Sequence, residues 1–147
     1  MRFACVMLAL LIPASVDAAS AHLKKVLPHF IDRDGLHTLS PSLYERDAYQ
    51  RELRRKPELR SGLRFDVQWK GSRKTPMVIR VELRGAKDGA ETTADIHRQV
   101  VRRGWFSKWS SVELTGDEYA KLGELVAWRA TIWAGDQLMD EQRSFLW

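Results

Sequence analysis

Two histidines, His22 and His97, are the residues of this chain whose chemistry is most distinctive. If a peptidase cuts after Ala21, the free amine and the imidazole of His22 form a bidentate ligand, and a second imidazole completes a T-shaped copper site. Imidazole nitrogen suits copper well. We therefore treat His22 and His97 as a candidate copper site that depends on this cleavage. The simpler interpretation is that His97, like His29 and His37, is a surface or strand residue.

The sequence around His97 adds a motif to this hypothesis. Asp95-Ile96-His97 resembles the D-x-H motif of periplasmic copper carriers, in which histidine braces lie on immunoglobulin-like sandwiches. Histidine braces also occur in copper monooxygenases that attack polysaccharides. We expect no cofactor, and the resemblance implies, as an alternative function, a periplasmic copper-binding protein that uses His22 and His97.

The segment from Arg102 to Trp109 interleaves aromatic side chains with cations. If they are exposed, these side chains would stack on sugar rings, contact a membrane surface or bind an acidic partner. The other interpretation places the aromatic residues in the core between two sheets, with the cations facing water, and the size of Trp favours the core. The candidate ligand-binding residues are Arg103, Trp105, Lys108 and Trp109. A glycan-binding module is therefore a second alternative function.

Motifs of the common enzyme classes are absent from the sequence, which has no phosphate-binding loop, no H-E-x-x-H helix and no G-x-S-x-G elbow. Asp32-Arg33-Asp34-Gly35 is similar to a fragment of a calcium loop. Its glycine comes too early and no glutamate stands at the twelfth position, so we interpret it as a turn. The basic stretch from Arg51 to Arg60 is interpreted as a solvated helix face rather than a phosphate clamp. We therefore expect a binding or structural role and no catalytic residues.

The first 21 residues have the pattern of an export signal. Met1-Arg2 is a minimal basic start, ten apolar residues from Phe3 to Ile12 follow, and small residues predominate after Pro13. Ten residues cannot span roughly 30 Å of hydrocarbon as a helix, so we expect cleavage rather than a permanent membrane anchor. Two cleavage points are open, after Ala18 and after Ala21. We expect a periplasmic or extracellular protein.

Removal of residues 1–21 leaves 126 residues with a net charge of +5 and without the single cysteine, Cys5. This excludes a disulfide scaffold, a thiolate zinc site and a cysteine nucleophile. Six Trp, five Phe and three Tyr argue against disorder. The pI of 9.6 does not indicate a nucleic-acid partner, because the chain contains no recognition motif and is expected to be exported. The expected partner is a protein or glycan of the cell envelope, and the oligomeric state is left open.

Residues 22–61 are expected to form an N-terminal unit that packs on the rest of the domain. Pro28 and Asp34-Gly35 predict short extended pieces around a tight turn between residues 26 and 39. The capping box Ser42-Leu43-Tyr44-Glu45 predicts the start of a helix, and Pro57 predicts its end near Arg55. The expected apolar stripe of this helix consists of Tyr44, Ala48, Tyr49 and Leu53.

Residues 62–147 are expected to form the core of a β-sandwich. Alternation of apolar and polar residues predicts strands over 63–69, 77–83, 96–103 and 108–114, with a polar loop over 85–93. A second capping box at Thr115-Gly116-Asp117-Glu118 predicts a short helical turn that Gly123 ends. A hairpin follows, with strands over 126–133 and 138–146 around a turn at 134–137. Many short strands with helices only in the connections predict a mostly β, antiparallel sandwich of about seven strands.

The strands over 63–69 and 77–83 look like the second and third strands of a fibronectin type III or immunoglobulin-like domain. Leu114-Thr115-Gly116 with Tyr119 is similar to the tyrosine corner of such sandwiches. Three stretches also resemble small exported bacterial proteins of unknown function: Leu27 to Gly35 continuing through Leu43 to Gln50, then Ser61 to Trp69, and Val126 to Trp133 continuing to Trp147. The resemblance implies this fold and export from the cell, and it assigns no functional residues.

Overall fold

The computed structural model describes residues 19–72, 75–101 and 106–147. Its elements, in chain order, are β1 (Ala21–Asp32), α1 (Leu43–Arg55), the 3-10 turn η1 (Pro57–Leu59), β2 (Arg60–Gly71), β3 (Pro76–Lys87), β4 (Ala90–Val101), β5 (Lys108–Thr115), α2 (Gly116–Leu122), β6 (Glu124–Ala134) and β7 (Gln137–Arg143). Most of the expected export segment, residues 1–18, lies outside this description, as do Arg103 and Trp105. Neither α-helix in the described part of the chain has the length and apolarity that a membrane crossing requires.

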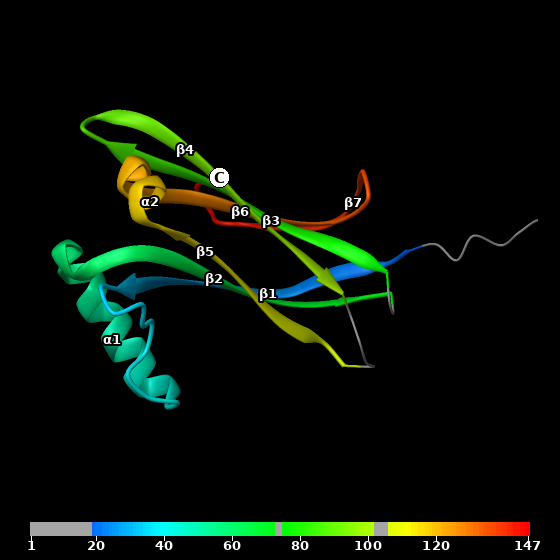
Figure 1. The fold of residues 1–147 in the computed structure, drawn as a ribbon, viewed down its shortest axis with the longest axis horizontal. Coiled ribbons are helices and arrows are strands. Elements are labelled where there is room, and N and C mark those ends of the chain that lie inside the picture. The colour runs from blue at the N-terminus through cyan, green and yellow to red at the C-terminus, as the bar shows by residue number, and fades with distance from the viewer. Residues whose placement is uncertain (1–18, 73–74, 102–105) are drawn as a thin grey trace, which may run out of the picture.

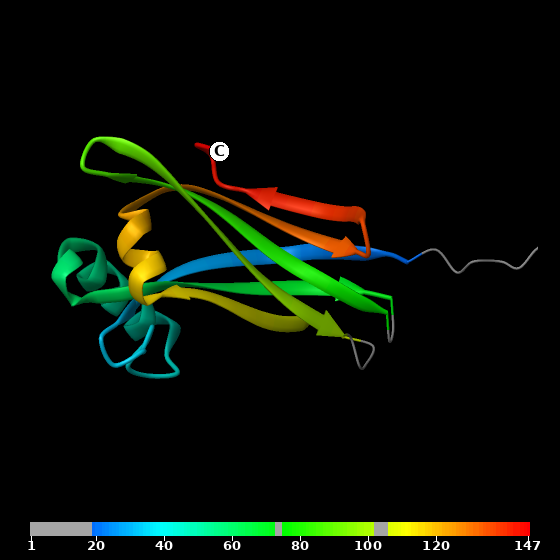
Figure 2. The same cartoon turned by 45° about the horizontal axis from the view of Figure 1, so that its top comes forward.

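The strands form two antiparallel sheets that lie one over the other (Figures 1 and 2). The three-stranded sheet has the order β1-β2-β5, and the four-stranded sheet has the order β4-β3-β6-β7. Across the interior β1 faces β6 and β7, while β5 faces β4. Helix α1 lies at one end of the three-stranded sheet, and α2 links the two layers at the same end (Figure 1). The prediction of a mostly β, antiparallel sandwich is confirmed.

The core lies between the two sheets, where the alternating apolar residues of the predicted strands meet. Leu63, Phe65, Val67 and Trp69 of β2 and Met77, Ile79, Val81 and Leu83 of β3 are all buried. Each such side chain contributes about 1.5–3 kcal/mol of transfer free energy. Trp69 also has a polar partner, because its Nε1 donates to Ser110 Oγ at 3.0 Å. The alternation that fills the core turns Arg64 and Asp66 to the outer face of the three-stranded sheet.

Strand β1 is an edge strand, and side chains from other elements satisfy part of its exposed backbone. Near its start, Leu23 N donates to Asp140 Oδ2 of β7 at 2.8 Å, and Gln142 Nε2 donates to Leu23 O at 2.9 Å. Near its end, Phe30 N donates to Gln50 Oε1 of α1 at 2.8 Å, and Gln50 Nε2 donates to Phe30 O at 2.9 Å. These contacts replace a neighbouring strand at both ends of β1 and tie α1 to the sheet.

The predicted structure of two segments is wrong. The polar stretch 85–93 is a hairpin rather than a loop, because Asp88 and Gly89, with φ of 51° and 79°, form a two-residue turn between β3 and β4. An Asp-Gly pair is a strong hairpin signal, and its polar surroundings obscured it. The stretch before the turn at Asp34 is one twelve-residue strand, β1, rather than short pieces. Pairing with β2 along its whole length carries the strand past Pro28.

Both helices begin and end where they are expected, but their capping is different. Ser42 and Thr115 occupy the N-cap positions with extended backbone angles, yet neither side chain makes a capping hydrogen bond. Tyr44 is 78% exposed, so the predicted apolar stripe of α1 is wrong at that position. The buried residues of α1 are Gln50 and Leu53, because only one turn of the helix packs against β1. The last strand, β7, ends at Arg143 rather than at residue 146.

Candidate metal centre

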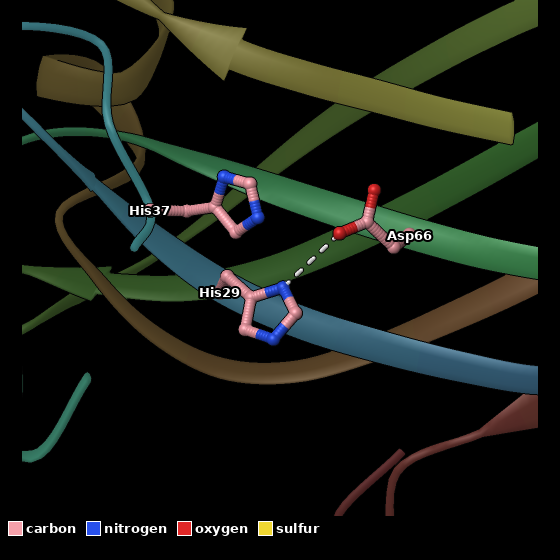
Figure 3. Close-up of side chains that lie close together, drawn as sticks. All are labelled: His29, His37 and Asp66. Carbon is pink, nitrogen blue, oxygen red and sulfur yellow. Dashed lines mark ion pairs between the residues drawn. The ribbon is translucent and has the colours of Figure 1, made fainter. Parts of the chain in front are cut away.

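Three side chains from separate parts of the chain place metal-binding atoms close together. His29, His37 and Asp66 each offer one such atom, and the three atoms lie within 4.8 Å of one another. His29 comes from β1 and Asp66 from β2, while His37 comes from the segment that joins β1 to α1 (Figure 3). The register of β1 on β2 explains the first contact. His29 pairs with Arg64, which places it on the outer face of the sheet, diagonally beside Asp66.

His29 and Asp66 form a close ion pair, and its length also fits two ligands of one metal ion. His29 Nδ1 lies 3.3 Å from Asp66 Oδ2 (Figure 3), and His29 is only 7% exposed. Within the residues that the structure describes, this buried nitrogen has no hydrogen-bond partner. Two ligands of a tetrahedral zinc ion, each about 2.0 Å from the metal, lie about 3.3 Å apart. The pair therefore already has the spacing of two zinc ligands.

Asp66 is held in place through its other oxygen. Arg64 Nε and Ser111 Oγ both donate to Asp66 Oδ1, at 2.9 Å and 2.8 Å, which leaves Oδ2 directed toward His29. Burial alone would raise the pKa of this carboxyl. The contacts from His29 and Ser111 and the charge of Arg64 outweigh burial and hold the pKa well below its usual range. Asp66 is therefore an ionised, pre-oriented ligand at neutral pH.

His37 completes the group from the connecting segment. Its ring centroid lies 5.3 Å from that of His29. Partial burial, together with the positive charge of Arg64, lowers the pKa of His37, so its imidazole is neutral at pH 7 and has a free lone pair. Metal binding needs this neutral form.

The segment that carries His37 is fastened at two points. Gln50, which is 2% exposed, donates from Nε2 to His37 O at 2.8 Å as well as to the backbone of Phe30. Asp32 Oδ1 accepts hydrogen bonds from Asp34 N at 2.9 Å and from Leu36 N at 2.8 Å, and Asp32 Oδ2 accepts one from Tyr49 Oη. The turn signal at Asp34-Gly35 is thus a real turn, closed by the Asp32 carboxylate, and it returns His37 toward His29.

A cleft of about 450 Å³ lies between β1 and α1, and His29 is the one of the three metal-binding residues that lines it. His29 and Gln50 form part of its wall, and three arginines of α1 line it: Arg46, Arg51 and Arg54. Leu27, Pro28 and Asp47 complete the lining. A buried imidazole therefore has access to a cationic cleft.

No protein-family model, curated protein or solved structure matches the chain. The function has to be inferred from the geometry of the site itself.

The two histidines that the sequence suggested for copper lie far apart in the topology. His22 is exposed at the start of β1, with its Nδ1 3.8 Å from Asp140 Oδ2 of β7. His97 is exposed on β4, where it pairs with Arg80. Since β1 lies over β6 and β7 while β4 lies over β5, the two strands occupy opposite edges of the sandwich. The structure therefore does not bring His22 and His97 together.

Of the four predicted ligand-binding residues, Lys108 and Trp109 lie in the described part of the chain. Both are exposed on β5, and Trp109 is 52% exposed, so the expectation that it fills the core is wrong. Trp109 pairs with Gln68 and Ser111 pairs with Asp66, which places Trp109 on the same outer face as the metal-binding group. The core is filled instead by Trp69 and, in part, by Trp128.

Sequence interpretation missed His29, His37, Asp66 and Gln50 as a group. One signal was available, because His29 and His37 stand eight residues apart on either side of the Asp34-Gly35 turn. A turn between two histidines favours their meeting. Asp66 carried no such signal, because it is one of several polar residues that alternate along β2.

Proposed function

We propose that this chain is a metal-binding protein that holds one divalent transition-metal ion, best fitted by Zn²⁺, between His29, His37 and Asp66. One observation carries the proposal: the buried Nδ1 of His29 lies 3.3 Å from Asp66 Oδ2 without forming a hydrogen bond within the described residues. A shared cation accounts for that spacing, and it would also satisfy the buried nitrogen. The role is binding rather than catalysis.

The set of ligands favours zinc over harder ions. Two imidazoles and one carboxylate are a nitrogen-rich set, which suits Zn²⁺, Cu²⁺ or Fe²⁺ better than Ca²⁺ or Mg²⁺. Zn²⁺ accepts four ligands in a tetrahedron and has no preference for a planar arrangement. His29 and Asp66 already have this spacing, and only His37 needs to approach. Three protein ligands leave a fourth position open for water or another ligand.

Zinc titration by calorimetry on the full chain tests the proposal. We expect one zinc ion per chain, and we expect His37→Ala to weaken the affinity by more than the 10–100-fold that loss of an outer contact typically costs. The matched control is His97→Ala, which removes an exposed histidine of β4 and should leave the affinity unchanged. Equal zinc affinity of the wild type and His37→Ala would overturn the proposal.

The copper hypothesis is separated from this proposal by a second variant. In a Cu²⁺ titration of protein that begins at residue 22, His22→Ala removes the imidazole of a terminal brace and leaves His29, His37 and Asp66 intact. We expect His22→Ala to bind Cu²⁺ as the wild type does, since any nitrogen-rich site for Zn²⁺ also accepts Cu²⁺. Loss of tight copper binding in His22→Ala alone would favour the brace instead.

We also propose that the chain is exported to the periplasm or beyond the cell. The support is the basic, apolar and small-residue pattern of residues 1–21. Intact mass of the protein recovered outside the cytoplasm tests this proposal and gives the cleavage point, with Ala19 or His22 as the expected new terminus. A protein that stays in the cytoplasm with Met1 still attached would contradict it.

We further propose that the sandwich is of the fibronectin type III kind. Its fourth strand, β4, pairs with β3 in the larger sheet, whereas a constant-type immunoglobulin domain places its fourth strand beside the smaller group of first, second and fifth strands. Helix α1, between the first two strands, is an addition to that plan. An experimental structure with the fourth strand on the three-stranded sheet would contradict this assignment.

A second candidate function is glycan binding, favoured by the exposure of Trp109. Its ring would stack on a sugar of the cell envelope, and Lys108 beside it in the sequence would donate hydrogen bonds to the sugar hydroxyls. Polysaccharide should change the tryptophan fluorescence of the wild type and not that of Trp109→Ala. A Trp109→Ala variant with the wild-type response would remove this candidate.

A further inference from the structure

The arginines of α1 that line the cleft differ in how they are neutralised. Arg46 forms an ion pair with Asp47 at 3.1 Å. Arg51 and Arg54 have no acidic partner among the residues that the structure describes, although both line the same cleft as His29. A guanidinium group binds oxyanions through two parallel N–H donors, which makes it the usual residue for carboxylate and phosphate recognition. The cleft therefore carries two cations available to a ligand.

A bound metal ion would increase the positive charge around the site. Arg64 is shared between Asp66 at 2.9 Å and Glu113 at 3.1 Å. The four arginines of the site and the cleft, with the three carboxylates paired to them, have a net charge of +1. The arginines are Arg46, Arg51, Arg54 and Arg64, and the carboxylates are Asp47, Asp66 and Glu113. A divalent ion raises this charge to +3. Such a site attracts a doubly charged anion more strongly than a singly charged one.

We propose that the metal-loaded protein binds a phosphate-type dianion in the cleft between β1 and α1, with one oxygen on the open position of the metal and the others on Arg51 and Arg54. This inference rests on the proposed zinc site. Phosphate monoesters carry close to two negative charges at pH 7 and offer three acceptor oxygens. A cleft of about 450 Å³ holds a phosphate group with part of the molecule to which it is attached.

The same phosphate group can come from a soluble ester or from a lipid head group. Four apolar side chains between the turn after β1 and the first turn of α1 are exposed, which would suit a lipid source: Leu36, Leu39, Leu43 and Tyr44. The experiment is run at a pH above the second pKa of methylphosphonate, so that methylphosphonate is the soluble dianion, and vesicles containing phosphatidic acid supply the membrane-bound one. Either source supports the oxyanion site, and the arm that responds identifies which source it takes.

Metal and anion should reinforce each other, because the anion coordinates the metal cation directly, and this coupling is reciprocal. We expect methylphosphonate to raise the zinc affinity of the full chain at least about tenfold, which corresponds to a typical coupling between sites. Acetate, a monoanion, should have a smaller effect. In the Co²⁺-loaded protein, methylphosphonate should change the visible absorption bands, since it enters the coordination sphere of the metal.

The decisive variant is Arg51→Gln/Arg54→Gln. It should bind zinc as the wild type does in anion-free buffer and lose the increase that methylphosphonate causes. The matched control, Arg33→Gln/Arg55→Gln, removes the same charge from exposed positions that do not line this cleft, and it should keep the increase.

Three results would overturn the inference: no effect of either methylphosphonate or the vesicles, equal loss of coupling in both double variants, or Co²⁺ bands that neither source of the anion changes. Failure of the wild type to bind zinc at all would instead overturn the proposed metal site. Zinc binding without anion coupling would leave the metal site intact and remove only the phosphate inference.

Discussion

Replacing Gln50 tests how the candidate metal site is positioned, because Gln50 holds the backbone of His37 without itself being a metal ligand. Its side chain is 2% exposed and makes three hydrogen bonds, accepting from Phe30 N and donating to Phe30 O and His37 O. It therefore closes the end of edge strand β1 and fixes the segment that carries His37. Gln50→Leu keeps most of the volume and removes all three bonds.

The expected cost follows from those bonds. A typical intramolecular hydrogen bond contributes about 0.5–1.5 kcal/mol net, and a buried group left without a partner costs about 1–3 kcal/mol. Water can reach part of this region, because Phe30 and His37 are only partly buried. We therefore expect Gln50→Leu to lower the free energy of unfolding by about 2–4 kcal/mol. Zinc affinity should also fall about 10–100-fold, because Gln50 holds the backbone of a ligand.

Urea unfolding of the metal-free protein measures the first effect, and zinc calorimetry measures the second. Gln99→Leu is the matched control, since Gln99 is exposed on β4, and its stability should stay within about 0.5 kcal/mol of the wild type. A Gln50→Leu protein as stable as the wild type would refute the role of Gln50 at the edge of β1. A destabilised variant with full zinc affinity would refute its role in positioning His37.

Three other substitutions test separate contacts. The hydrogen bond to Asp32 raises the pKa of Tyr49 to about 12, so the stability that this bond contributes is present below pH 10 and is lost as the pH rises from 10 toward 12. In urea unfolding, Tyr49→Phe should remove this alkaline loss of stability, and Tyr44→Phe, at an exposed tyrosine, should retain it. Ser111→Ala removes a donor to Asp66 and should weaken zinc binding about 10–100-fold, whereas Ser110→Ala, which removes the partner of Trp69, should lower only the stability. Gly85→Ala should destabilise the fold by about 1–3 kcal/mol, because a Cβ there would meet Leu122 O of α2; an unchanged urea midpoint would mean that α2 can move away.

The fold was readable from the sequence where apolar and polar residues alternate. Residues 63–69 and 77–83 alternate regularly, and both segments lie within strands whose apolar faces form the core. The ends of both helices were also readable, because Pro57 disfavours helical geometry at Lys56 and Gly123 accepts the positive φ of 74° that ends α2. Strand β4 was harder to find, because most of its side chains are exposed at a sheet edge and few of its positions need to be apolar.

The candidate site was not readable, because its parts depend on the pairing of distant segments. His29 meets Asp66 only through the register of β1 on β2, and that register spans residues that no local pattern connects. Gln50 carries no sequence signal for burial, because it is buried only by substituting for a neighbouring strand at Phe30. The pairing of His22 with His97 rested on a free amine after cleavage and on a D-x-H motif, neither of which specifies strand order, and the topology separates the two histidines.

The edge of the three-stranded sheet explains why a metal site can form at this place. An interior strand would have a neighbour on both sides, whereas β1 leaves one side open, and the segment with His37 and the side chain of Gln50 occupy that side. Asp66 is already ionised and oriented, and His29 is already buried next to it. Of the three ligands, only His37 therefore has to be ordered when the metal binds, and the turn closed by Asp32 keeps the entropic cost of this ordering small. By linkage, zinc at 100 times its dissociation constant would stabilise the fold by about 2.7 kcal/mol, comparable to the contribution that we assign to Gln50. The metal ion and helix α1 would thus both stabilise the edge formed by β1, and α1 also supplies the arginines of the proposed anion site.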